Sequence, residues 1–335
     1  WQGGGYDSGY AKGRIPQNGK MSKHIQFESN MSLTGANADR RVAVTPTDQK
    51  KVLAALYTYI TGAGSKSTLD PNLDAEVVKA AKQVQKQGKN AVVVSGIQDV
   101  DAQLLVLAIN KAIGSKAFNE DTPRMIRQGN AKAVAQLIKD MNSGKVGALL
   151  VAGVNPMYSL PNAAEFKTGL EKVDLSVAFT MHNDETAEVC NYIATTQHYL
   201  ESWGDVQFKK NSFSLMQPTI RPLFDTRQFQ ETLLKWTGND TAYNDYIKDT
   251  WSGVLGNTSW NQALHDGVLV KPMMAKAELT EAIETPEGDQ VEGEEATTTN
   301  APIVGAAARR LSTAKANGME LTLYTKVALG DGQQA

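Results

Sequence analysis

The sequence predicts an α/β protein with Rossmann-like parallel sheets, helices on both faces of them, and the start of a further, partly β region at the C-terminal end. Short apolar runs rich in β-branched and small residues are typical of buried parallel strands. They cover residues 90–96, 146–153 and 175–181. Segments with apolar residues at helical spacing alternate with these runs, which indicates right-handed crossover connections.

Helices are predicted where apolar residues recur at a spacing of three or four. Asp70 or Asn72 is a candidate N-cap of the second helix, and Gly114 and Gly144 are expected to close the two helices that precede them. The predicted helices cover residues 47–61, 74–87, 99–113, 130–141 and 162–173.

The chain is predicted to have three parts. They are a loop-rich segment at 1–45 that continues an upstream domain, a Rossmann-like α/β domain at 46–240, and an irregular region at 241–335. We expect the sequence to be a fragment of a longer chain, because it starts at Trp1 without an initiator Met and ends in a turn-like run.

Composition changes near the two ends. Residues 1–21 are rich in Gly, Ser, Asn and Lys, which predicts a loop. The interval 278–295 is acidic and has no Lys or Arg, and with the threonines that follow it predicts a solvated connector over 278–299. Residues 320–329 begin with alternating apolar and polar residues, so the connector is expected to lead to a β segment.

Charge and cysteine content exclude several classes of protein. A formal net charge of −2 provides no basic surface for nucleic acid. No run of apolar residues is long enough to span a membrane. Cys190 is the only cysteine, so the chain has no internal disulfide and no cysteine-ligated iron–sulfur or zinc site. Its apolar neighbours predict a buried, unreactive thiol.

Several short motifs follow one another in a characteristic order. Gly153-Val154-Asn155-Pro156 comes after a predicted strand, and Asp184-Glu185-Thr186-Ala187 comes after the next. Further along are Glu201, Gly204-Asp205, Asn211 and Gln217-Pro218. Over residues 20–240 this order resembles the large subunits of the molybdopterin oxidoreductase superfamily.

Two further segments resemble one branch of that superfamily. They are residues 22–29 (SKHIQFES) and 32–42 (SLTGANADRRV). This branch contains the fused molybdopterin-like and iron–sulfur subunits of alternative complex III, a bacterial quinol-oxidising membrane complex. The resemblance implies a subunit at the periplasmic face of the inner membrane, beside haem c and integral membrane subunits. It also implies iron–sulfur clusters in other parts of the full subunit, and a molybdopterin-like domain without its cofactor.

The sequence departs from the active members of the superfamily at two places. Residues 189–196 (VCNYIATT) lack the Asp and Pro of the usual Ala-Asp-Val-Val-Leu-Pro-like run. Residues 211–214 (NSFS) stand where the relatives have Asn-x-Glu-Gly-Arg. We therefore expect a structural scaffold in a respiratory electron-transfer complex, with no catalytic residue, no metal ligand and no cofactor in this segment.

The candidate site residues are Asn155, Pro156 and Asp184, which we interpret as remnants of a nucleotide site. Ligands of parallel sheets bind beyond the carboxyl ends of the strands, where these residues lie in the predicted fold. With a cofactor, Asn155 and Asp184 would contact its nucleotide portion. Without one, they would cap the turns and bind backbone N–H groups, and we favour this second interpretation.

The histidines offer weaker candidates. His24 and Glu28 would share a face if they were in a helix, which gives half a metal site at best, and a structural hydrogen bond is the preferred interpretation. His182, near Asp184 at a strand end, has a geometry that allows proton transfer. His198 is expected to form a local network with Glu201.

Two other functions stay open on the sequence. The first is a catalytic molybdopterin-guanine-dinucleotide oxidoreductase of the sulfur-compound reductase type. The second is the nucleotide-binding middle domain of a thiamine-diphosphate enzyme, which shares the strand–helix pattern. Molybdenum and pterin content separates the first from a scaffold, and a cysteine-rich segment after Ala335 would exclude the second.

Overall fold

The computed structural model describes residues 6–126, 129–271, 300–324, 330 and 332. The chain divides into two compact units, residues 1–119 together with 287–335, and residues 120–286. We call them the terminal unit and the inserted unit. The range 46–240, assigned to one domain from the sequence, is therefore shared between both.

The terminal unit joins a short parallel sheet to a group of helices. Strands β1 (Ile25–Glu28) and β2 (Arg40–Ala43) pair in parallel, with Ile25 opposite Arg40. The long helices of this unit are α3 (Pro46–Thr61), α4 (Pro71–Gln87), α5 (Val100–Ala112) and α13 (Asn300–Ser312). Its shorter helices are α1 (Tyr6–Gly13), α2 (Leu33–Ala36) and the 3-10 turn η1 (Gly88–Asn90).

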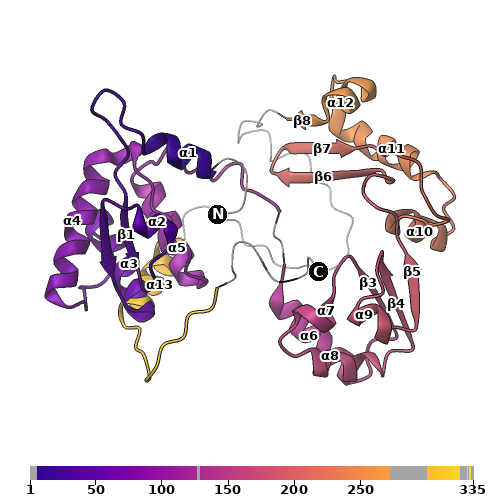
Figure 1. Cartoon of the computed structure of the whole chain (residues 1–335), viewed down its shortest axis with the longest axis horizontal. Helices are drawn as coiled ribbons and strands as arrows, with labels where there is room; N and C mark the ends of the chain where they lie inside the picture. The colour runs from indigo at the N-terminus through magenta and orange to yellow at the C-terminus, as the bar shows by residue number, and fades with distance from the viewer. Residues whose placement is uncertain (1–5, 127–128, 272–299, 325–329, 331, 333–335) are drawn as a thin grey trace. The chain divides into compact units, whose positions relative to one another are not determined.

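The core of the terminal unit includes residues from both ends of the chain. Val77, Leu105 and Ile109 are fully buried, and so is Ala307 of α13. In Figure 1 the yellow helix α13 accordingly lies among the purple helices. Alanines on α3, α4, α5 and α13 are buried where these helices meet, which allows close approach of the backbones. The terminal unit is thus completed by a helix that follows the inserted unit in sequence.

Helix ends in this unit follow the sequence signals. Thr45 is the N-cap of α3 and accepts a hydrogen bond from Asp48 N, with Pro46 at the first helical position. Asp70, rather than Asn72, is the N-cap of α4. Gly114 follows α5 with φ +61°, a conformation that glycine adopts without strain.

The strand predicted at 90–96 is wrong. η1 ends at Asn90, and the residues that follow are extended but belong to no strand. Side chains take the place of a neighbouring strand here. Asn110 Oδ1 accepts from Val93 N at 2.9 Å and its Nδ2 donates to Val93 O at 2.7 Å, while Ser115 Oγ donates to Ala91 O at 2.6 Å. An apolar β-branched run alone did not reveal this arrangement.

The inserted unit contains the predicted Rossmann-like sheet. Strands β3 (Ala148–Ala152), β4 (Leu175–Thr180) and β5 (Tyr192–Thr195) are parallel, in the order β3-β4-β5. This confirms the runs at 146–153 and 175–181 as strands. The helices that accompany this sheet are α6 (Ala131–Asn142), α7 (Pro156–Ser159), α8 (Ala163–Leu170) and α9 (Glu185–Val189). Their core contains Ile138, Met141, Phe166, Leu170 and Val173.

A second, antiparallel sheet belongs to the same unit. It has the order β6 (Gly204–Lys209), β7 (Ser212–Met216) and β8 (Val268–Val270). The helices of this part are α10 (Phe229–Trp236), α11 (Tyr243–Leu255) and α12 (Trp260–Asp266). Trp251 of α11 is 1% exposed, and its indole N–H donates to Asp205 Oδ2 at 2.9 Å.

The prediction of an irregular region from residue 241 is therefore wrong for residues 243–270. Ile247, Trp251 and Ala263 are buried together against side chains of β7 and β8, so α11, α12 and β8 form one cluster. Tyr243, Trp251 and Trp260 belong to this cluster, with Trp251 perpendicular to Trp260 at 6.3 Å between ring centroids.

The two ends of the chain also differ from prediction. Helix α1 lies in the region predicted as a loop at 1–21, and β1 and β2 lie in the loop-rich segment 1–45. Residues 320–324 form no strand, whereas 325–329 and the acidic connector 278–299 lie outside the described residues.

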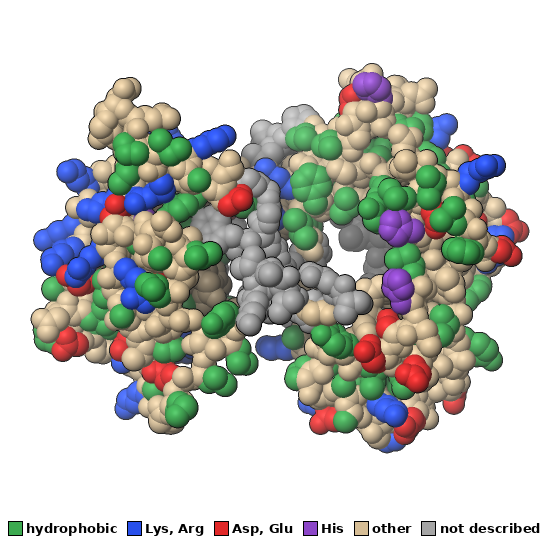
Figure 2. Space-filling view, viewed as in Figure 1, with side chains coloured by type: hydrophobic (Ala, Val, Ile, Leu, Met, Phe, Trp, Pro, Cys, Tyr) green, Lys and Arg blue, Asp and Glu red, His purple; other side chains and the backbone are tan. Residues whose placement is uncertain are grey.

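The described helices include none that is both long and apolar enough to cross a bilayer. On the face seen in Figure 2, positive and negative side chains are interspersed on both units. This mixed surface agrees with the near-zero net charge.

Candidate functional site

The candidate site lies at the carboxyl ends of β3 and β4. Ala152, at the end of β3, is paired with Phe179, near the end of β4. Because the two strands are parallel, the turns that follow them emerge at one edge of the sheet. Gly153 begins the first turn with φ +64°, and its N–H donates to Phe179 O at 3.2 Å. This geometry brings Asn155 and the Asp184 turn together, as the sequence predicted.

Asn155 connects the two turns through its side-chain amide. It is the N-cap of α7, with Pro156 at the first helical position. Its Oδ1 accepts from Thr186 Oγ1 at 2.6 Å, and its Nδ2 donates to Glu185 Oε2 at 2.7 Å. Thr186 is 1% exposed, and its hydroxyl also accepts from Met157 N at 3.0 Å. The buried threonine hydroxyl therefore bridges the ends of the two strands.

Asp184 caps the second turn. It is the N-cap of α9, and its Oδ1 accepts from Thr186 N at 3.1 Å and Ala187 N at 2.8 Å. The hydrogen bond from Asn155 lowers the pKa of Glu185 below its ordinary value, so this exposed carboxyl is ionised at neutral pH. The arrangement satisfies backbone donors and adds negative charge at the sheet edge.

Comparison with known families gives the decisive observation. The molybdopterin oxidoreductase family matches residues 15–230, more than half of the chain.

The chain belongs to the molybdopterin oxidoreductase family.

Two known proteins are similar to this chain, one in sequence and one in fold. The molybdopterin-binding-like subunit of menaquinone reductase from Nitratidesulfovibrio vulgaris (strain Hildenborough) is 29% identical over 234 residues, which are 66% of this chain and 32% of that protein. Acetylene hydratase from Pelobacter acetylenicus has a similar fold, with a TM-score of 0.53 at 12% identity over 75% of this chain and 48% of that chain. The chain thus spans about a third of the one relative and about half of the other.

The two strand-end turns lie within the region that matches the molybdopterin oxidoreductase family, and the structure shows which hydrogen bonds their side chains form. The side-chain amide of Asn155 and one carboxylate oxygen of Asp184 are hydrogen-bonded to groups of this chain, and Glu185 places a carboxylate beside them. A nucleotide phosphate at this edge would compete with these bonds and meet a negative charge. In this structure Asn155 and Asp184 cap the two turns.

Thr186 and Glu185 are the residues whose roles the sequence analysis missed. Both were noted within the Asp184–Ala187 motif, but no role was assigned to either. A threonine two residues after a capping aspartate, just beyond a strand, was the available signal.

His24 and Glu28 do not form the pair that a helix would give, because Glu28 ends strand β1 and His24 precedes it. His24 Nδ1 is hydrogen-bonded to Tyr10 Oη at 2.8 Å. Glu28 is buried and accepts from Arg41 Nε at 2.6 Å and Ser32 Oγ at 2.6 Å. Burial raises the pKa of Glu28, but the hydrogen bonds from Ser32 and Arg41 together outweigh it and leave the pKa below its ordinary value.

The remaining candidates have local structural roles. Glu201 accepts from Leu223 N at 2.9 Å and His198 N at 3.0 Å, which confirms a network at His198 and lowers the pKa of Glu201. The backbone N–H of His182 donates to Thr180 Oγ1 at 3.2 Å, and the residue is exposed. Cys190 is partly buried, where the sequence predicted a buried thiol, and this burial raises the pKa of the thiol, which fits an unreactive cysteine. Among the described residues no group of three or more His, Cys, Asp or Glu could hold a metal ion.

Proposed function

We propose that this chain is the scaffold part of a molybdopterin-oxidoreductase-like, iron–sulfur subunit of a membrane-associated quinol:electron-acceptor oxidoreductase. The complex we propose is alternative complex III of a bacterial respiratory chain. Family membership and the likeness to a menaquinone reductase subunit support a respiratory oxidoreductase subunit. The segments 22–29 and 32–42 are the reason for choosing this particular complex.

The observation that carries the scaffold role is the internal closure of the strand-end site. The side-chain amide of Asn155 is hydrogen-bonded to Glu185 and Thr186, and one carboxylate oxygen of Asp184 accepts from two backbone N–H groups. Groups used in this way hold two loops together without a ligand. We infer that the domain keeps the family's shape for docking and does not bind the molybdenum cofactor.

The partners follow from this role. Cys190 is the only cysteine of the chain, so electron-transfer clusters have to be provided by other parts of the full subunit. We propose that this part contacts haem c and integral membrane subunits at the periplasmic face of the inner membrane. The related protein is itself named as a subunit, which supports a multi-subunit assembly.

Metal and pterin analysis of the purified complex tests the proposal. We expect molybdenum far below one atom per complex and no pterin fluorescence after oxidative extraction, while iron is present in cluster amounts. A molybdenum enzyme carried through the same purification is the control. Stoichiometric molybdenum with extractable pterin would contradict the scaffold role and favour the catalytic alternative.

The catalytic alternative has one observation in its favour, because Asn155-Pro156 and Glu185-Thr186-Ala187 keep the family's motifs at the sheet edge. The thiamine-diphosphate alternative is excluded by membership of the molybdopterin oxidoreductase family.

A further inference from the structure

A second sheet edge, in the terminal unit, also has the position of a ligand site. An open pocket of about 840 Å³ lies where β1 and β2 end and where α3 and α4 begin. Its lining includes Ser29 and Val44, which follow the two strands, and Thr45 and Asp70, which cap the two helices. In folds with parallel strands, a helix N-terminus at such an edge is a common position for an anion such as phosphate.

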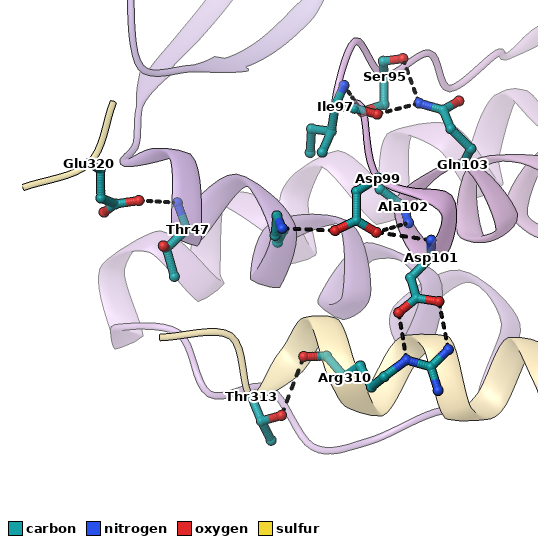
Figure 3. Close-up of polar contacts among 11 residues, drawn as sticks. Thr47, Ser95, Ile97, Asp99, Asp101, Ala102, Gln103, Arg310, Thr313 and Glu320 are labelled. Carbon is teal, nitrogen blue, oxygen red and sulfur yellow. Dashed lines mark hydrogen bonds and ion pairs between the residues drawn. The ribbon is translucent and has the colours of Figure 1, made fainter. Parts of the chain in front are cut away.

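The first turn of α3 has no N–H group left for an external anion. Pro46 has no N–H, and Asp48 N donates to Thr45 Oγ1 at 3.1 Å. Thr47 N donates to Glu320 Oε2 at 2.7 Å (Figure 3). A carboxylate at a helix N-terminus is favoured both by the hydrogen bond and by the helix dipole. Glu320 therefore occupies the position that an anionic ligand would take.

Three other carboxylates line the pocket besides Glu320. Asp48, Asp70 and Glu76 line it together with Glu320, and its described lining includes no Lys or Arg. Hydrogen bonds from Arg40 and Lys79 lower the pKa of Glu76, so this carboxyl is ionised at neutral pH. Asp48 and Glu76 are themselves paired with cations, Lys51 for the first and Arg40 and Lys79 for the second. Glu320 is the carboxylate that binds the α3 N-terminus directly.

Glu320 belongs to a segment fastened at several points, which we call the strap (residues 313–324). The helix before it, α13, is joined to α5 by two hydrogen bonds of 2.6 Å from Arg310 to Asp101 (Figure 3). Thr68 Oγ1 donates to Ser312 O at 2.5 Å, immediately before the strap. At its far end, Tyr324 Oη accepts from Asn30 Nδ2 at 3.2 Å, beyond β1.

We propose that the strap is a built-in closure of this sheet edge, in which Glu320 serves as an internal ligand of the α3 N-terminus and keeps phosphate-bearing ligands out. The closure does not depend on the proposed respiratory function. The anion position at the N-terminus of α3 is filled from within the chain.

Hydrogen–deuterium exchange at Thr47 in the full subunit tests the closure. Glu320→Ala should speed exchange of the Thr47 amide by about tenfold or more, because a charge-assisted hydrogen bond is lost. Glu320→Gln, which keeps a neutral acceptor, should give a smaller increase. The matched control is Glu171→Gln, at an exposed glutamate of the inserted unit, which should leave Thr47 unchanged.

Inorganic phosphate at millimolar concentration provides the second measurement. It should slow Thr47 exchange in Glu320→Ala and have no effect in the unsubstituted protein. Unchanged Thr47 exchange in both Glu320 variants would overturn the proposal, and so would equal protection by phosphate with and without Glu320. If Glu320→Ala does not fold, the Gln variant decides the matter by the same comparison.

Discussion

At the scale of single residues, Thr186 is central to the hydrogen bonding of the site, although the sequence analysis assigned it no role. Its hydroxyl donates to Asn155 Oδ1 and accepts from Met157 N, and it is buried. Asn155 and Asp184 could be predicted as neighbours, because parallel strands end at one edge. The bridging role of Thr186 could not, because it depends on a turn 31 residues earlier in the chain.

Thr186→Val should test this bridge, because valine keeps the shape of threonine and removes only the hydroxyl. We expect a loss of about 1–3 kcal/mol in the free energy of unfolding, because Met157 N and Asn155 Oδ1 lose a buried partner. Urea denaturation of the purified chain measures it. The control is Thr168→Val, at an exposed helical threonine, with an expected change within about 0.5 kcal/mol. Equal effects of both substitutions would show that the bridge contributes nothing.

At the scale of elements, the sequence predicted helices and strands that depend on a local pattern. It missed features that depend on residues far away in the chain. Strands β3 and β4 and helices α3 to α6 match their apolar patterns. The prediction of a strand at 90–96 was wrong, because the side chain of Asn110, on the next helix, forms hydrogen bonds with the backbone of this run. Strand β8 was not predicted, because its partner β7 lies more than fifty residues earlier in the chain. The contact between Glu320 and Thr47 could not be predicted from a local sequence pattern, because the two residues are 273 positions apart.

Helix α1 shows how an element without a core can be held by charge. It has no buried residue, and Arg14, just after it, donates to Asp39 Oδ2 at 2.6 Å. The hydrogen bond from Arg14, and then the one from His24 N, lower the pKa of Asp39 to about 2. The unfolded value is about 3.9. The ionised carboxylate therefore stabilises the folded state above about pH 4, and this contribution is lost as the pH falls toward 2.

Asp39→Asn should remove this pH dependence. At pH 6 the variant should be less stable than the parent protein, and the difference should shrink as the pH falls from about 4 toward 2. Thermal unfolding at a series of pH values measures the difference. Asp7→Asn, which removes an exposed carboxyl of α1, is the control. A constant Asp39→Asn effect from pH 6 to pH 2 would mean that the ion pair does not hold the helix.

At the scale of the whole molecule, residues that share a core are not always close in the sequence. The chain leaves the terminal unit after Asn119, forms the inserted unit, and returns at α13. The buried residues Ala307, Ala308 and Leu311 then share a core with α3 and α5. Each unit has its own buried clusters, so a core substitution should be felt within one unit only.

Leu105→Ala and Phe166→Ala test this division, because both side chains are buried, one in each unit. Each should cost its own unit about 2–5 kcal/mol through the cavity left behind. In hydrogen exchange by mass spectrometry, Leu105→Ala should raise exchange in peptides from α3 and also from α13, although these are far apart in sequence. Peptides from α6 and α8 should respond only to Phe166→Ala. Leu33→Ala, at a side chain 85% exposed, is the control and should change neither set. If Leu105→Ala raised exchange in α6 and α8 as much as in α13, the chain would unfold as one cooperative body, and α13 would not be the helix that closes the terminal unit.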